Sequence, residues 1–318
     1  MDPLIILFGL GVGMLIGMTG MGGGSLMTPI LIIVFGYNPV TAVGTDLAYG
    51  AITKTVGGWR HFRRRNVFLP LAIWMGVGSI PAAIGGVYVL HQLEDKYGKS
   101  FDNAMLVAVA AAVMLTGIVV LTRALFMKKL LQRERESFVM STRDKVYAAL
   151  LGLFVGFVLG VTSAGSGTLI AVGMILIFRL TPQRVVGTDV IHAAVLLWAA
   201  SLAHVIAGNV DYGLMATILI GSIPGVWIGS HLAFRLPTAT LRLGLAIVMI
   251  GAGLGLLTKA GAGIPGWVIA AVPVVLAALV AWQLLSERAK RLRLAEREPT
   301  LRDRGLTGGI ARSSGRVP

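Results

Sequence analysis

The sequence of 318 residues contains no cysteine, which excludes disulfide bonds, iron–sulfur clusters, thiolate metal sites and cysteine nucleophiles. Its five histidines are scattered and form no HExxH pattern, so no metal site is expected. A GxxxxGK[ST] motif is also missing, which argues against direct use of ATP. No nucleophile with a matching base can be recognised. We therefore expect no enzyme, no catalytic residues and no cofactor.

Charged residues are scarce as well. They make up 13% of the chain and hydrophobic residues 56%, whereas soluble proteins have roughly 25% and about 45–50%. The mean hydropathy of +0.82 and the long uncharged runs are typical of a membrane protein. This composition excludes most soluble enzymes and binding modules.

The basic residues are unevenly distributed, although the net charge of +14 at first suggests nucleic-acid binding. Most of the 28 Lys and Arg residues gather in a few connections and one tail: residues 60–65, 123–145 and 288–316, with Arg179, Arg184, Arg235 and Arg242 in two short connections. Cytoplasmic loops of membrane proteins carry such clusters. We expect a lipid bilayer as the partner and no nucleic acid.

The chain contains an internal repeat. When the sequence is aligned with itself at an offset of 143 residues, GTD at 44–46 matches 187–189, and GSIP at 78–81 matches 221–224. Glycines 9, 13 and 17 match glycines 152, 156 and 160. The basic run 60–65 matches residues 203–208, which carry no Lys or Arg, and Arg179 and Arg184 match the uncharged Gly36 and Thr41. The halves should therefore have opposite topology in the membrane.

The predicted fold is an all-α polytopic membrane protein with two inverted-topology repeats and one extra C-terminal helix. Each repeat has a Gly-rich broken or re-entrant helix pair, at 4–36 and 147–178, plus about three spanning helices. The predicted spans are 40–58, 67–90, 104–127, 183–206, 213–235, 241–258 and 267–286. The predicted divisions are a first repeat (1–127), a cytoplasmic linker (128–146), a second repeat (147–258), an extra helix (259–286) and a basic, disordered cytoplasmic tail (287–318). No cleaved signal peptide is predicted.

The two Gly-rich breaks are the strongest candidates for a ligand site. Helices of about 12–15 residues reach only about 18–22 Å, so the breaks should lie inside the membrane and converge near its midplane. Glycines allow close approach of a ligand, and a helix start offers N–H groups to an anion. The alternative is that the glycines only permit close helix packing. The predicted substrate-binding residues are Thr19, Gly22, Gly23, Gly24, Ser25, Thr162, Gly165, Ser166, Gly167 and Thr168.

The Gly-rich break near the N-terminus, the GTD motif at the start of the next helix and the second copy of both resemble the sulfite exporter TauE/SafE family. The resemblance covers roughly residues 4–258 and leaves out the tail. It implies a polytopic transporter of sulfur-containing anions such as sulfite, sulfoacetate and other sulfonates.

Ionisable residues inside the predicted spans are further candidates, because isolated charge in lipid is unfavourable. Asp46 and Asp189, next to Thr45 and Thr188, are interpreted either as proton carriers or as acceptors that brace the re-entrant loops, and bracing is favoured. Lys54 either extends toward the cytoplasm or faces inward and attracts an anion. His192 either donates to an oxyanion or relays a proton, or it bonds within the helix bundle, which is favoured.

These features predict a secondary transporter that exports a small sulfur-containing oxyanion by alternating access between the two breaks. The alternatives are an anion channel with the breaks as a selectivity filter, a transporter of another small anion, or a membrane scaffold without transport activity. Protons are a candidate coupling ion, and a homodimer is left open. The expected location is the inner (plasma) membrane, as a multi-pass protein with a cytoplasmic C-terminus and an outside N-terminus.

Overall fold

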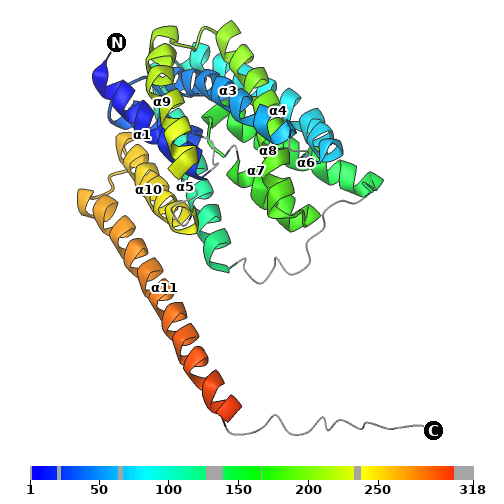
Figure 1. Ribbon diagram of the computed structural model, residues 1–318. Coiled ribbons are helices and arrows are strands. Elements are labelled where there is room, and N and C mark those ends of the chain that lie inside the picture. Colours follow the sequence, from blue (N-terminus) through cyan, green and yellow to red (C-terminus); the bar gives the residue numbers. More distant parts are fainter. Residues whose placement is uncertain are drawn as a thin grey trace, which may run out of the picture. The chain divides into compact units, whose positions relative to one another are not determined.

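The computed structural model describes residues 2–19, 23–63, 67–126, 139–165, 167–232 and 238–303, and these residues form helices and connections (Figure 1). The chain divides into two units, Met1–Pro273 and Val274–Pro318. The elements in order are α1 (Pro3–Thr19), α2 (Gly24–Ile33), α3 (Pro39–Arg63), α4 (Leu69–Tyr97), α5 (Lys99–Phe126), α6 (Thr142–Thr162), α7 (Thr168–Gly173), the π-helix η2 (Met174–Phe178), α8 (Pro182–Ile206), α9 (Tyr212–Leu232), α10 (Thr238–Lys259) and α11 (Gly266–Asp303).

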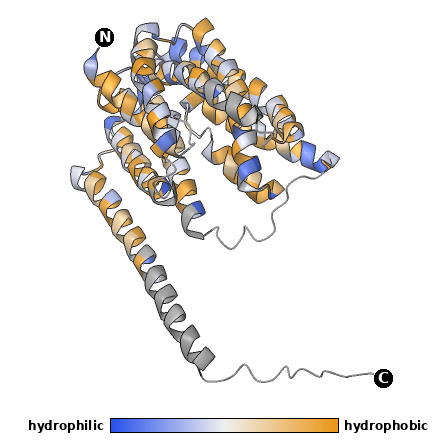
Figure 2. Ribbon diagram, in the orientation of Figure 1, coloured by the Kyte–Doolittle hydropathy of each residue, from blue (hydrophilic) through white to orange (hydrophobic). Residues whose placement is uncertain are grey.

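The predicted helical membrane protein is confirmed. Among the described residues, seven helices are long and apolar enough to cross a membrane. Six of them lie at predicted spans: α4, α5, α8, α9, α10 and α11. The seventh is α6, which was predicted as half of a re-entrant pair, whereas the predicted span 40–58 in α3 is not among the seven. Figure 2 shows hydrophobic residues along most of these helices. Their outer faces carry exposed large apolar side chains, such as Ile73 at 61% and Trp227 at 66% exposure. Apolar side chains in such positions are compatible with lipid contact.

Both helix breaks are present, but the helix before the second break is longer than expected. α6 begins at Thr142 rather than near residue 147, because Ser141 and Asp144 form a capping box that starts the helix early. The helices after the breaks are short: α2 has 10 residues, and the segment Thr168–Phe178 continues α7 into η2. At about 1.5 Å per residue, neither can cross a hydrocarbon core of about 30 Å.

The helix α11 extends beyond the predicted span. It was expected to end at residue 286 and to be followed by a disordered tail, but it continues to Asp303. The residues after 286 are rich in Leu, Ala, Glu and Arg, all good helix formers. Residues 304–318 lie outside the described part of the chain.

The contact between α1 and α9 has an equivalent in the contact between α6 and α4. Glycines of α1 pack against the backbone of α9, and the matching glycines of α6 pack against α4: Gly13 meets Ser222, and Gly156 meets Ser79. These two contacts are related by the repeat offset. A Cβ atom at either glycine would collide with the serine backbone, so both positions require glycine for this close approach.

The helices α3 and α8 run antiparallel to each other. Lys54 of α3 contacts Asp189 near the start of α8, whereas Gly44 near the start of α3 packs against His204 near the end of α8. Because α3 and α8 are repeat mates, their antiparallel contact is the arrangement that an inverted repeat requires. It supports the predicted inversion, while the orientation of each half in a bilayer stays a prediction.

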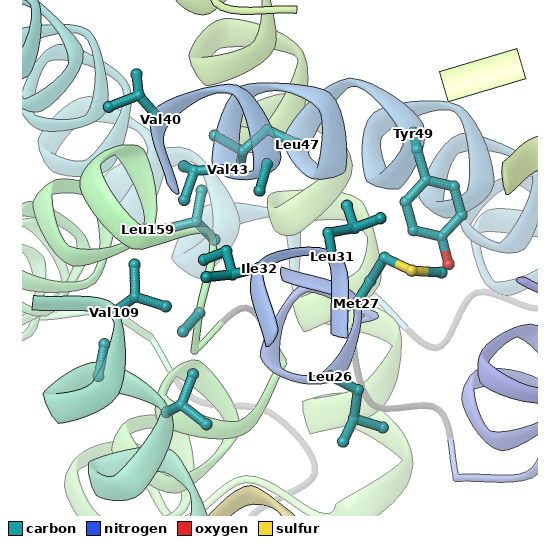
Figure 3. Packing of buried hydrophobic residues seen from close by; sticks show 14 of the residues in the cluster. Leu26, Met27, Leu31, Ile32, Val40, Val43, Leu47, Tyr49, Val109 and Leu159 are labelled. Atoms are coloured by element: carbon teal, nitrogen blue, oxygen red, sulfur yellow. The ribbon is translucent and has the colours of Figure 1, made fainter. Parts of the chain in front are cut away.

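The short helix α2 is surrounded by protein. Its residues Leu26, Met27, Leu31 and Ile32 belong to a buried cluster shared with α3, α5 and α6 (Figure 3). A second buried cluster surrounds α7 and η2. Interrupted helices at membrane depth are tolerated where protein covers them, so this packing makes the two breaks compatible with a membrane interior.

Candidate functional site

The two breaks are in direct contact. The Ser25 hydroxyl at the start of α2 accepts a hydrogen bond from the Gly165 N–H in the second break, with 3.3 Å between Oγ and N. Gly24 packs so tightly against Ser163 that a Cβ atom would collide with the Ser163 carbonyl oxygen and hydroxyl. Two segments that are far apart in the sequence therefore form one site. Gly22 and Ser166 lie outside the described residues.

The second break depends on left-handed backbone conformations. Ser163, Gly165 and Gly167 have φ angles of 57°, 96° and 93°. The Ser163 N–H donates to the Leu159 carbonyl and thereby ends α6. Glycine adopts positive φ without a steric penalty, which explains the glycines at two of these three positions.

A small cavity lies where the breaks meet. Three predicted residues line it, Thr19, Ser25 and Thr168, together with apolar side chains that include Leu245 and Met249 of α10. Its volume of about 10 Å³ is enough for about one water molecule. Leu245 and Met249 lie near the middle of α10, so the cavity lies about halfway along a candidate membrane span.

Thr162 does not line this cavity. Its hydroxyl donates to the Val158 carbonyl and accepts the Ala164 N–H, with distances of 2.7 and 3.3 Å. It therefore serves the end of α6 and the turn that follows. Gly23 and Gly24 instead provide room: a Cβ atom at Gly23 would lie 2.9 Å from the Tyr49 hydroxyl oxygen.

Asp46 connects three parts of the site. Its Oδ2 accepts hydrogen bonds from the hydroxyls of Thr28 in α2 and Ser163 in the second break, each at 2.7 Å. Its side chain is buried, with 1% exposure of the residue. A carboxylate that ties α3 to α2 and to the opposite break has the contacts that the bracing hypothesis requires. Proton transfer by Asp46 stays the alternative.

Asp189, the repeat mate of Asp46, has a different partner. The Lys54 Nζ lies 3.5 Å from Asp189 Oδ2, and the two side chains are only 9% and 5% exposed. Lys54 therefore faces inward rather than extending toward the cytoplasm. The repeat explains the difference, since Thr28, Ser163 and Lys54 correspond to Ala171, Gly20 and Leu197 in the other half.

Thr45 and Thr188 form equivalent hydrogen bonds between the two halves. Thr45 Oγ1 accepts the N–H of Asp211, just before α9, at 3.0 Å. Thr188 Oγ1 accepts the N–H of Phe68, just before α4, at 2.9 Å. Each hydroxyl holds the start of a helix from the opposite half. The threonines of the GTD motifs thus stabilise the fold and do not line the cavity.

His192 bonds within the helix bundle. Its Nε2 lies 2.9 Å from the hydroxyl oxygen of Ser79 in α4, and both residues are buried. It lines an apolar groove of about 530 Å³ between α4 and α8 rather than the cavity at the breaks. The position supports the second interpretation of His192, a polar contact between helices.

A family model described as sulfite exporter TauE/SafE matches residues 5–256. The chain belongs to this family. The probable membrane transporter protein YjnA of Bacillus subtilis (strain 168) is 39% identical over 81% of this chain and 100% of its own length. The probable membrane transporter protein MJ0441 of Methanocaldococcus jannaschii is 25% identical over 80% and 95% of the two chains. No solved structure matches.

Membership of the TauE/SafE family identifies the chain as a multi-pass membrane transporter. The matched residues contain both breaks and both GTD motifs and end within α10, so α11 lies outside the match. The recognition made from the sequence is confirmed.

Two groups of residues at the candidate site could not be identified from the sequence. Thr28 and Ser163 contact Asp46, but nothing in the sequence marks which hydroxyls meet across the halves. Arg242, assigned above to a connection, donates from Nη2 to the Thr19 carbonyl at the end of α1, at 3.0 Å. One signal existed: Arg242 corresponds to Lys99, so both copies carry a basic residue at this point.

Proposed function

We propose that this protein is a secondary transporter that exports a small sulfur-containing oxyanion by alternating access, with the substrate bound between the two breaks. The substrate class is sulfite, sulfoacetate or a related organosulfonate. The observation that carries the proposal is the contact between the breaks beside a cavity lined by the hydroxyl residues Thr19, Ser25 and Thr168. Family membership supports transport and suggests the sulfur-containing class.

Neutral hydrogen-bond donors suit a substrate that must be released as well as bound. A hydrogen bond to a charged group contributes about 1.5–3 kcal/mol, so a few hydroxyls and N–H groups hold an anion without trapping it. The cavity of about 10 Å³ is too small for such an anion. Substrate entry therefore requires the breaks to separate, as alternating access demands, and the present conformation is the closed one.

The membrane potential favours the proposed direction of transport. An inside-negative potential favours export of an anion by about 2.3 kcal/mol per charge per 100 mV. Export is then electrogenic, with or without a proton as the coupling ion. We place the protein in the inner (plasma) membrane, with the basic connections 60–65 and 123–145 and the C-terminus in the cytoplasm.

The test is transport by the full-length protein in proteoliposomes, with imposed pH and voltage gradients and sulfite or sulfoacetate as substrate. Saturable flux that follows the voltage is expected. Ser25→Ala and Thr168→Ala should each raise the apparent KM about tenfold or more, because each removes a hydrogen bond to a charged group. The matched control is Thr116→Ala, which removes a buried hydroxyl that bonds only within α5.

Several outcomes contradict this proposal. Absence of sulfite and sulfonate movement under every gradient refutes the substrate class. Flux that rises linearly and never saturates indicates a channel instead. An unchanged KM in folded Ser25 and Thr168 variants moves the binding site away from the breaks.

A further inference from the structure

Two arginines lie at the same end of the contact between α5 and α10. These helices run antiparallel, since Gly117 of α5 packs against Ala246 of α10 while Gly253 packs against Met114. The same register places Arg123, near the end of α5, opposite Arg242, near the start of α10. Two positive charges at this position repel each other. Both side chains are partly buried.

The charges around this pair do not balance. Arg123 also interacts electrostatically with Asp189, whose nearest basic group is Lys54 at 3.5 Å. Among the residues that the structure describes, neither arginine has a carboxylate within 4 Å. Arg123, Arg242 and Lys54 bring three positive charges against the single negative charge of Asp189. Buried charges require compensation, and here two positive charges remain uncompensated by these groups.

The pair lies beside the first break. The Arg242 Nη2 is bonded to the carbonyl of Thr19, the residue that ends α1 and lines the cavity. The Arg242 Nε is buried and has no hydrogen-bond partner among the described residues. A buried donor without a partner is energetically unfavourable, and this one lies next to the candidate substrate site.

We propose that Arg123 and Arg242 form a receiving site for a small, doubly charged oxyanion, which binds there before it passes to the two breaks. The planar guanidinium fork matches the spacing of two oxygens on one anion, and two such forks at one end of the helix pair suit a tetrahedral or pyramidal dianion. The excess of two charges favours a dianion over a singly charged lipid phosphodiester. This inference rests on the proposed function for the route of the anion, but its binding test does not.

The test measures anion binding to the purified full-length protein in lipid-free detergent by calorimetry. The probes are sulfite, at a pH where it is a dianion, and methanesulfonate, a monoanion of similar shape. We expect sulfite to bind more tightly, and its affinity to fall more steeply with added salt. Arg123→Gln and Arg242→Gln should each weaken sulfite binding at least tenfold, while substitution by Lys should have a smaller effect because the charge remains.

The matched control is Lys259→Gln. Lys259 lies at the other end of α10 and donates to the Ile32 carbonyl at the end of α2, as Arg242 does at the end of α1. If Arg242 served only to hold a helix end, both variants would change sulfite affinity equally, and this outcome overturns the receiving site. Equal affinity and equal salt dependence of the two anions in the wild-type protein also overturn it, without any variant.

The two proposals fail in different ways. Arginine-dependent sulfite binding without transport in proteoliposomes refutes the proposed function and leaves the receiving site standing. Saturable sulfite export with an unchanged KM in both arginine-to-glutamine variants refutes the receiving site and leaves the proposed function standing.

Discussion

The buried ion pair between Lys54 and Asp189 allows a quantitative prediction about stability. The two charged atoms lie 3.5 Å apart, and their side chains are 9% and 5% exposed. At an effective dielectric constant of about 20, two unit charges at this distance attract each other by about 5 kcal/mol. Loss of one partner leaves the other charge buried and unpaired, which costs about 3–5 kcal/mol. We expect Lys54→Leu and Asp189→Asn each to lower the free energy of unfolding by about this amount.

The double variant provides the decisive comparison. Lys54→Leu introduces the residue that the second half carries at the matching position, Leu197, and Asp189→Asn keeps the shape of the carboxylate. With both charges removed, the loss of stability should be much smaller than the sum of the two single losses, because neither member of the pair is left without the other. The measurement is denaturant-induced unfolding in detergent, followed by circular dichroism.

Asp46→Asn is the control for this cycle, since Asp46 bonds to hydroxyls rather than to a cation. It should lower the free energy of unfolding by only about 1–3 kcal/mol. If the single losses at Lys54 and Asp189 add up in the double variant to within about 0.5 kcal/mol, the two side chains do not stabilise each other and the reasoning is refuted.

Three further predictions concern the hydrogen bonds of Thr45 and Thr188, the role of Asp46 and the inverted topology of the two halves. Thr45→Val and Thr188→Val should each lower the free energy of unfolding by about 1–3 kcal/mol and leave the transport KM unchanged. A shift in KM would contradict a purely structural role of the two hydroxyls. Asp46→Asn should reduce transport modestly and preserve its pH dependence, whereas loss of proton dependence in a folded protein would assign Asp46 to coupling. Cysteines introduced at Arg64 and Gly208, which the repeat places at equivalent ends, should react with an impermeant reagent from opposite sides of the membrane; labelling from one side would refute the inversion.

The sequence by itself determined the class of protein and the location of its breaks. Composition, hydropathy and glycine spacing act locally along the chain, so they predicted the helices and the breaks after Thr19 and Thr162. The repeat offset also matched Gly13 with Gly156 and Ser79 with Ser222, and the structure shows these residues in equivalent contacts, Gly13 with Ser222 and Gly156 with Ser79. Local patterns failed at helix ends: they missed the capping box at Ser141, which starts α6 early, and the helical continuation of α11.

Only the tertiary structure decided which side chains meet. Asp46 and Asp189 occupy matching positions in the repeat, yet one accepts hydroxyl hydrogen bonds and the other pairs with Lys54. Arg123 and Arg242 are far apart in the chain and are brought to the same end of a helix pair only by the register of α5 against α10. Such pairings depend on how helices from distant parts of the chain slide and rotate against one another. Hydrophobic periodicity constrains which face of a helix is buried, but it does not fix which buried polar groups come within hydrogen-bonding distance.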